Sequence, residues 1–407
     1  MSSKERLIRY CKIDTQSNPN NEDVTPSTDK QFDLAKLLVE ELKELNLEDI
    51  ELDEHCYVYA KLPSNLDYPT KTVGFIAHMD TAPDFSGKDV KPRIIENFDG
   101  NDINLNEKMV IKMEEYPWMK DFKGKTLMVT DGTTLLGADD KAGITCIMEA
   151  ISYLVNHPEV KHPTIAIGFT PDEEIGNGAK YFDIKKFGAD FAYTMDGDTV
   201  RELSDETFNA SSAVVRITGF SIHPGSAKNK MVNACLVAER FIAAMPKDTV
   251  PEKTEGREGF IHLHNMNGSC EKAELEYIIR DHDIDKLHEK ENLLISEAEK
   301  LNKELGEERV VVEIKEGYHN MKEVLDKYPE VVDIARNALN TLGLKIKNEP
   351  VRGGTDGAVL SFMGLPCPNL GTGCGNFHGP YEYCVIEELD MAKDVILKII
   401  ELVGEMK

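Results

Sequence analysis

The stretch Thr170-Pro171-Asp172-Glu173-Glu174-Ile175-Gly176 follows a run of apolar and β-branched residues at positions 164–169. Such a run predicts a buried β-strand, so three consecutive carboxylates stand where a strand ends. Their charges repel one another unless a cation lies among them. In an extended backbone Glu173 and Glu174 would point to opposite sides, so that one could bind a metal ion while the other faces a water molecule. A solvated acidic turn is the simpler alternative for this stretch alone.

Other predicted strands also end in acidic residues or histidine. A β-branched strand at 71–77 leads into His78-Met79-Asp80, and an apolar strand at 191–195 ends at Asp196-Gly197. Helical periodicity at 144–155 lies between them in the sequence. Strands that alternate with helices predict a largely parallel sheet covered on both faces. Ligands of such sheets lie beyond the carboxyl ends of the strands, where these motifs stand.

The pattern changes near residue 207. Residues 208–318 predict a strand, a helix, two strands, a helix and a strand, which is the order of a ferredoxin-like unit. The earlier pattern resumes after residue 319, and a length of 407 residues favours two domains. The predicted fold class is therefore α/β. A mixed, mostly parallel sheet with helices on both faces is formed by 1–207 and 319–407, and a ferredoxin-like α+β domain at 208–318 is inserted into it.

Two further segments bear on the fold. Thr28 and Gln31 predict a capping box at the start of a helix that runs to about Leu45. Residues 81–130 are long, polar and rich in turn signals, and they contain the single tryptophan, Trp118. No pattern in them predicts a structure.

Composition excludes several classes of partner. The chain has 47 Lys and Arg against 73 Asp and Glu, a net charge of −26, which would repel nucleic acid and anionic membranes. No run of 18 apolar residues predicts a membrane span, and the charged N-terminus lacks the core of a signal peptide. The eight cysteines show no CxxC spacing, so we expect free thiols and a cytoplasmic protein.

Several nitrogen and oxygen donors stand at predicted strand ends or in loops, and we take these as candidate metal ligands: His78, Asp139, Glu174, Asp196 and His378. Imidazole and carboxylate donors without thiolates suit two zinc ions, with manganese or cobalt as substitutes. Five ligands serve two ions if one carboxylate bridges them. Two cations beside a water molecule lower its pKa and polarise a substrate carbonyl.

Two more acids have predicted catalytic roles. Asp80 lies two residues from His78 and is placed to orient its imidazole, and Glu173 is the natural general base and proton shuttle. Each motif also has a structural alternative, because a His-x-Asp sequence can be structural and Asp139-Asp140 can cap the helix that follows. Their joint occurrence in one predicted sheet favours a dinuclear site.

The order of these motifs resembles the cocatalytic zinc peptidases that include carboxypeptidase G and aminoacylase, and among them most of all the tripeptide aminopeptidases. The resemblance runs nearly end to end. It also includes these motifs: Asp14-Thr15-Gln16-Ser17, Gly137-Ala138-Asp139-Asp140-Lys141, Ile222-His223-Pro224-Gly225, Tyr277-Ile278-Ile279-Arg280, Arg352-Gly353-Gly354-Thr355-Asp356-Gly357 and His378-Gly379.

This resemblance implies how the ligands divide between the ions. His78 and Asp196 would bind one metal, Glu174 and His378 the other, and Asp139 would bridge them. Asp139 is preferred over Asp140 because the family's ligand is the first acid of Asp-Asp-Lys. The inserted domain resembles the family's lid and dimerisation domain, so a homodimer is expected.

Further residues are candidates for substrate binding. His223, in the loop Ser-Ile-His-Pro-Gly, is placed to stabilise an oxyanion, and Arg280 and Arg352 are candidate forks for a peptide carboxylate. A surface histidine and structural ion pairs are the alternatives. Asp198, after Asp196-Gly197, departs from the more glycine-rich family pattern. An extra acid near the metals would shift specificity or affinity, and a merely solvated side chain is the alternative.

The predicted function is that of a dinuclear zinc aminopeptidase that removes the N-terminal residue of tripeptides, with small peptides as its partners. A dipeptidase, deacylase or carboxypeptidase with the same metal chemistry is one alternative, and a substrate panel distinguishes them. A non-catalytic peptide-binding protein is the other. The presence of Glu173, Asp80 and all five ligand positions argues against it, since a protein without catalysis would be free to lose them.

Overall fold

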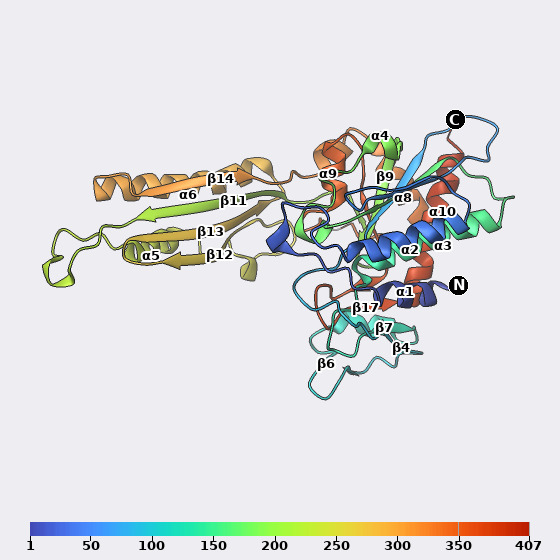
Figure 1. The fold of residues 1–407 in the computed structure, drawn as a ribbon, viewed down its shortest axis with the longest axis horizontal. Helices are drawn as coiled ribbons and strands as arrows, with labels where there is room; N and C mark the ends of the chain where they lie inside the picture. The colour runs from blue at the N-terminus through green and yellow to red at the C-terminus, as the bar shows by residue number, and fades with distance from the viewer. Residues whose placement is uncertain (349, 407) are drawn as a thin grey trace. The chain divides into compact units, whose positions relative to one another are not determined.

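The computed structural model describes residues 1–348 and 350–406 (Figure 1). The chain divides into two compact units. Unit 1 comprises Met1–Asp205, Met321–Glu349 and Thr355–Lys407, and unit 2 comprises Glu206–Asn320 and Pro350–Gly354. Unit 2 is thus inserted into the sequence of unit 1.

Unit 1 is built on a seven-stranded sheet of order β1-β2-β8-β3-β9-β15-β10. The inner strands are parallel to one another, and they are β8 (Ile165–Thr170), β3 (Val73–His78), β9 (Phe191–Gly197) and β15 (Asn369–Gly371). The strands towards the edges pair antiparallel, and they are β1 (Glu48–Leu52), β2 (Val58–Leu62) and β10 (Leu203–Ser204). Every residue of β3 and β8 is buried, as expected for strands covered on both faces.

Side chains alternate between the two faces of this sheet. Phe75 and Ile167 pack into the larger apolar cluster, whereas Ile76 and Ala166 pack into a smaller one on the other face. Helices that supply most of the helical residues of the larger cluster are α1 (Ser3–Cys11), α2 (Gln31–Glu44), α3 (Ala138–Asn156), α8 (Pro329–Thr341) and α10 (Ile386–Gly404). The smaller cluster includes residues of α4 (Ile184–Phe187) and α9 (Asp356–Phe362). The predicted fold class, a mixed sheet with helices on both faces, is confirmed.

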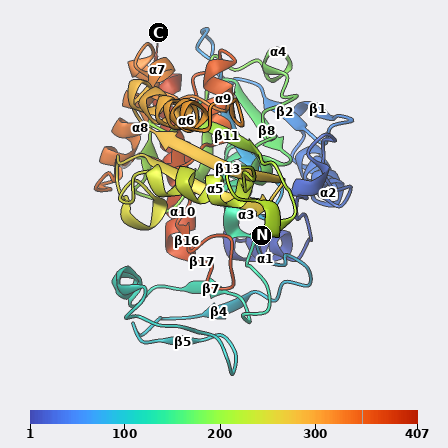
Figure 2. The ribbon, with the colours of Figure 1, turned by 90° about the vertical axis from the view of Figure 1, so that its left-hand side faces the viewer.

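Residues 81–130, for which no structure was predicted, contribute to a small separate sheet. Its order is β16-β17-β7-β4, and β7 lies between β4 and β17 in Figure 2. The strands are β4 (Arg93–Ile95), β7 (Leu127–Val129), β16 (Cys374–Gly375) and β17 (Tyr383–Val385). Residues 81–130 also contain a hairpin of β5 (Ile103–Asn104) with β6 (Val110–Ile111), and the 3₁₀ turn η2 (Pro117–Phe122). Strands of two or three residues are too short to show a period. Strand β7 pairs with β17, and β17 pairs with β16. Residues 81–130 thus help to hold the two strands that flank His378.

Unit 2 forms a four-stranded antiparallel sheet of order β12-β13-β11-β14. In chain order its elements are β11 (Asn209–Thr218), α5 (Ala234–Ala244), β12 (Phe260–Gly268), β13 (Lys272–Asp281), α6 (Ile284–Leu305) and β14 (Val310–Glu316). This is the ferredoxin-like order, and α5 and α6 share one apolar cluster with the sheet. Residues 350–354 join this unit through backbone bonds such as Phe208 N–H to the Gly353 carbonyl.

The predicted capping box of Thr28 and Gln31 is wrong. Helix α2 begins at Gln31, but no side chain caps it. The Gln31 amide instead donates to Asp172 Oδ1 at 2.6 Å, and its oxygen accepts the Asp172 N–H at 3.2 Å. The Gln31 side chain therefore binds Asp172 in the acidic loop instead of the N-terminus of its own helix.

The sequence predicted no membrane span, and it predicted free thiols. Among the described residues, no helix is long and apolar enough to cross a membrane. All eight cysteines are free, and Cys235 is the most exposed of them.

We expect Gly143→Ala to destabilise the protein by about 1–3 kcal/mol, as overpacking of a filled interior does. An added Cβ at Gly143, on α3, would overlap with the Met195 carbonyl of β9 and with the Asp140 carboxylate. The free energy of urea unfolding measures the effect. Gly379→Ala is the matched control, because nothing lies within 4 Å of its added Cβ. Equal stability of the two variants would contradict this account of the packing.

Candidate metal centre

The candidate ligands come from strand ends and from the loops beside them. His78 is the last residue of β3 and pairs in register with Thr170, the last residue of β8. Asp196 lies near the end of the neighbouring parallel strand β9. The carboxyl ends of parallel strands meet at one edge of a sheet, which is where ligands of open α/β sheets bind. The fold therefore gathers these side chains at one place.

Glu173 and Glu174 lie in a 3₁₀ turn, η3 (Glu173–Ile175), rather than in an extended segment. The expectation that they alternate across an extended backbone is wrong, because Asp172 takes a left-handed conformation, φ 53°, and starts the turn. The buried Asp80 carboxylate accepts the Glu173 N–H at 3.0 Å and the Glu174 N–H at 3.2 Å. Asp80 therefore fixes the turn that carries both acids.

Asp139 lies between two histidines and uses a different oxygen towards each. Its Oδ1 is 2.9 Å from His78 Nε2, and its Oδ2 is 3.5 Å from His378 Nε2. Asp196 Oδ1 lies 3.5 Å from His78 Nε2 on one side. Glu174 Oε2 lies 2.9 Å from His378 Nε2 on the other. The structure thus brings together all five predicted ligands in the order Asp196, His78, Asp139, His378, Glu174.

These residues fit a metal centre. Potential ligand atoms lie within 4.8 Å of one another in two groups, His78 with Asp139 and Glu174, and His78 with Glu173 and Asp196. The side chain of Glu174 is buried, and its Oε1 has no hydrogen-bond partner among the described residues. A buried carboxylate oxygen without a partner is costly, and a cation would satisfy it. Oxygen and imidazole donors without thiolate suit zinc, manganese or cobalt.

Asp80 and Asp140 support His78 from two directions. The His78 Nδ1 lies 3.2 Å from Asp80 Oδ1 and 3.1 Å from the Asp80 carbonyl, so Nε2 is directed towards Asp139. Asp140 accepts the backbone N–H groups of His78, at 3.1 Å, and Gly143, at 3.0 Å. Both oxygens of Asp140 are therefore bound to the backbone, whereas Asp139 faces the histidines.

Burial and neighbouring charges shift the pKa values of the acids and of His378 in the centre. Burial, followed by repulsion from Asp139, raises the pKa of Glu174 to about 8, and burial raises that of Asp196 to about 6. Hydrogen bonds to Asp139 and Glu174 raise the pKa of His378 to about 11. Without a metal ion the cluster thus holds protons that offset part of its negative charge.

Three buried acids close to the centre were not predicted as functional. Asp356 accepts the Thr170 hydroxyl at 2.7 Å, and burial raises its pKa to about 7. Asp172 accepts both the N–H and the hydroxyl of Ser27 at 2.6 Å. Glu382 binds backbone N–H groups beside Asp139. Asp172 and Asp356 lie in quoted motifs, which could have suggested them, whereas no pattern pointed to Glu382.

The predicted substrate-binding residues all belong to unit 2. His223 is exposed, and its Nδ1 accepts the Gly225 N–H at 3.1 Å. Arg280 donates to the carbonyls of Ser211 and Ile279. Arg352 donates to the carbonyls of Gly256, at 2.9 Å, and Glu258, at 2.7 Å. Both arginines thus have backbone partners within the unit, and their role towards a peptide carboxylate stays a prediction.

Asp198 takes part in a backbone network next to β15 and β16. Its N–H donates to Glu202 Oε2 at 2.9 Å, and its carbonyl accepts the Gly373 N–H at 2.7 Å. The structure therefore gives Asp198 a part in holding the loop that follows β9.

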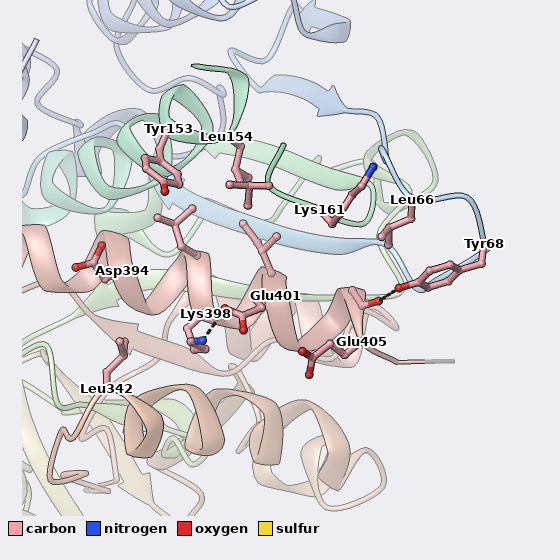
Figure 3. Close-up of a pocket in the computed structure, with 14 residues that line it drawn as sticks. Leu66, Tyr68, Tyr153, Leu154, Lys161, Leu342, Asp394, Lys398, Glu401 and Glu405 are labelled. Carbon is pink, nitrogen blue, oxygen red and sulfur yellow. Dashed lines mark hydrogen bonds and ion pairs between the residues drawn. The ribbon is translucent and has the colours of Figure 1, made fainter. Parts of the chain in front are cut away.

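Unit 1 also has a hollow of about 540 Å³ that contains none of the predicted site residues (Figure 3). It lies between Tyr68, the C-terminal end of α3 and helix α10, where Lys398 pairs with Glu401 at 2.5 Å. Leu154 on its wall is fifteen residues along α3 from Asp139, a helical distance of roughly 22 Å. This hollow is therefore separate from the candidate metal centre.

The sequence model of Peptidase family M20/M25/M40 matches residues 110–402. The chain belongs to this peptidase family. It is 52% identical over 403 residues to Peptidase T of Clostridium acetobutylicum, covering 98% of each chain, and 51% identical over 402 residues to Peptidase T of Staphylococcus carnosus, again covering 98% of each. The resemblance stated from the motifs is confirmed, and the chain is a hydrolase.

Solved structures of the family share the fold. Aminopeptidase PepT from Bacillus cereus superposes with a TM-score of 0.77 at 24% identity, covering 99% of this chain and 98% of that one. A tripeptidase from Staphylococcus aureus superposes with a TM-score of 0.79 at 22% identity, with the same coverage. A dinuclear metal binding peptidase from Bacillus subtilis gives 0.65 at 15% identity, covering 100% of this chain and 99% of that one.

We expect zinc binding near neutral pH to release protons. The pKa of His378, about 11 without metal, keeps its imidazole protonated, whereas a metal ion needs the neutral ring. Zinc affinity should therefore fall as the pH falls, because protons compete with the ion. Calorimetric titrations in buffers of different ionisation enthalpy measure the number of protons released, and identical apparent enthalpies in all buffers would contradict the expectation.

Proposed function

We propose that this protein is a dinuclear zinc aminopeptidase that releases the N-terminal residue of tripeptides. The observation that supports it most is Asp139, which directs one oxygen to His78 and the other to His378. A carboxylate that serves one ion has no need of two imidazoles on opposite sides. The tripeptide as substrate rests on the resemblance to Peptidase T, supported by 52% identity over nearly the whole chain.

The proposed ligands divide as the family resemblance implies. His78 and Asp196 would hold one zinc ion, Glu174 and His378 would hold the other, and Asp139 would be shared between them, with manganese or cobalt as substitutes. When bound, the two ions supply Lewis-acid chemistry at the peptide carbonyl and acidify a neighbouring water molecule. The Oε1 atom of Glu174, which has no hydrogen-bond partner in the part of the chain that the structure describes, supports its place in this set.

Glu173 is the proposed general base. Its backbone N–H is held by Asp80, and a carboxylate oxygen lies in one group with potential ligand atoms of His78 and Asp196. Burial, together with the charge of Asp196, raises the pKa of Glu173 well above its usual value. A base with a raised pKa can take a proton from water and return it to the leaving amine.

Other predicted roles belong to the same proposal. Residues 208–318 serve as lid and dimerisation domain of a cytoplasmic homodimer. His223 stabilises the oxyanion, and Arg280 or Arg352 binds the substrate carboxylate, in exchange for some of its present backbone contacts.

We expect Glu173→Gln to lower kcat by about 10²–10⁴-fold, the usual contribution of general acid–base catalysis, while both zinc ions stay bound. The amide cannot accept the proton, but it keeps the shape of the side chain. Steady-state kinetics and metal analysis measure the two effects. Glu54→Gln is the control, because Glu54 is almost fully exposed. Near-normal turnover of Glu173→Gln would refute the mechanism.

Cleavage of a tripeptide, but not of matching di- and tetrapeptides, is the expected specificity. Activity should disappear after chelator treatment and return with zinc. Cleavage of a dipeptide or an acylated amino acid instead would keep the metal chemistry but replace the substrate. Tight zinc binding without turnover of any peptide would favour a binding protein.

A further inference from the structure

Glu382 connects two segments that each carry a proposed metal ligand. It lies in the connection between β16 and β17, the same connection that carries His378. Its carboxylate is buried and reaches the segment that leads into α3, where Asp139 lies. The two segments are more than two hundred residues apart in sequence, so nothing in local structure brings them together.

All hydrogen bonds recorded for this carboxylate go to backbone N–H groups. Oε2 accepts from Leu136 at 2.7 Å and from Gly137 at 2.8 Å, and Oε1 accepts from Asp139 at 3.0 Å. A carboxylate that accepts several N–H groups inside a protein is firmly held. Glu382 is thus occupied on both oxygens, which leaves it suited to hold the backbone rather than to bind an ion.

The backbone before the regular part of α3 depends on this contact. The regular helix has a local cap, because Asp140 accepts the Gly143 N–H at 3.0 Å. Asp139 and Asp140 have non-helical backbone angles, so helical hydrogen bonds do not hold Asp139 in place. The carboxylate of Glu382, from a distant part of the chain, accepts the N–H of Asp139 and those of two residues before it.

The connection that carries His378 has few hydrogen bonds of its own. His378 has a left-handed backbone, φ 63°, and its side chain is 46% exposed. Within the connection, the Asn376 amide donates to the Tyr381 carbonyl at 3.2 Å and the Glu382 N–H to the Gly379 carbonyl at 3.3 Å. The Glu382 side chain adds three bonds between this connection and the backbone around Asp139.

We propose that Glu382 is a positioning residue that fixes the separation between Asp139 and His378, and so sets the affinity for the second metal ion. This inference rests on the proposed dinuclear centre. His378 and Glu174 approach the Asp139 Oδ2 side of the cluster, whereas His78 and Asp196 are anchored on sheet strands. Loss of the Glu382 contact should therefore affect one ion much more than the other.

Glu382→Gln tests the contact with a minimal change of shape. The amide has a single acceptor oxygen, and its NH₂ group cannot accept an N–H. If the oxygen keeps Leu136 and Gly137, the NH₂ group faces the Asp139 N–H and loses that bond. We expect one zinc equivalent to bind about 10–100-fold more weakly, as when partners that orient metal ligands are removed, while the other equivalent is nearly unchanged.

Zinc titration against a competing chelator on the full chain measures both affinities. Hydrogen exchange resolved to single residues supplies a second readout, in which the Asp139 amide should exchange faster in the metal-free variant. In kinetics at saturating zinc, kcat should recover with KM near that of the wild type. Glu382→Asp, which keeps the charge on a shorter side chain, is the alternative if Glu382→Gln does not fold, and it should show the same selective loss.

Glu41→Gln is the matched control. Glu41 is another buried acid of unit 1, and it pairs with Arg6 and Arg9. Its variant should lose thermal stability while both zinc affinities stay unchanged. If Glu382→Gln behaves like this control, the inference is overturned and the proposed function stands. If the wild-type protein binds no zinc, both fail together.

Discussion

Repulsion among buried carboxylates is the constraint on which the structure of unit 1 depends. The sheet brings the ends of β3, β8 and β9 together, and each end delivers at least one acid. Burying like charges without compensation is costly. Two kinds of partner offset this cost. Backbone N–H groups bind the acids that hold the site in place, here called the frame (Asp80, Asp140 and Glu382), whereas imidazoles face the acids that are proposed to bind metal.

Backbone N–H groups compensate the acids of the frame. Asp80 accepts the amides of Glu173 and Glu174, and Asp140 accepts that of His78. Glu382 accepts three, two from residues before α3 and one from Asp139 in its first turn. Each of these bonds joins a loop or strand end to another element. These hydrogen bonds offset the cost of burying the charges, and they also fix the backbone around the centre. Asp139, Glu174 and Asp196 face imidazoles instead, which leaves their oxygens directed to the interior of the centre.

Sequence patterns predicted the parts of this arrangement that follow from periodicity. Buried strands end at His78, Thr170 and Gly197, and strand ends of a parallel sheet converge, so the ligands at strand ends could be inferred together. Contacts between distant segments could not. Gln31 has the spacing of a helix cap but binds Asp172, and Glu382 has no pattern that marks it. The turn at Glu173 also escaped prediction, because one left-handed residue, Asp172, replaces the extended backbone. In 81–130 the strands are too short to have a period.

A network of ion pairs that only stabilises the fold is the structural alternative to a metal centre here. Such a network is most stable when every buried oxygen has a donor, because an unsatisfied one costs about 1–3 kcal/mol. The acids of the frame meet this condition with backbone donors, yet Glu174, a few ångströms from His378, keeps one buried oxygen without a partner. Its Oε2 is bound while its Oε1 is not, which is also true of Glu291 in unit 2. What distinguishes Glu174 is that it lies among other potential ligand atoms, those of His78 and Asp139. The proposed metal centre accounts for both the missing donor and the number of acids around it.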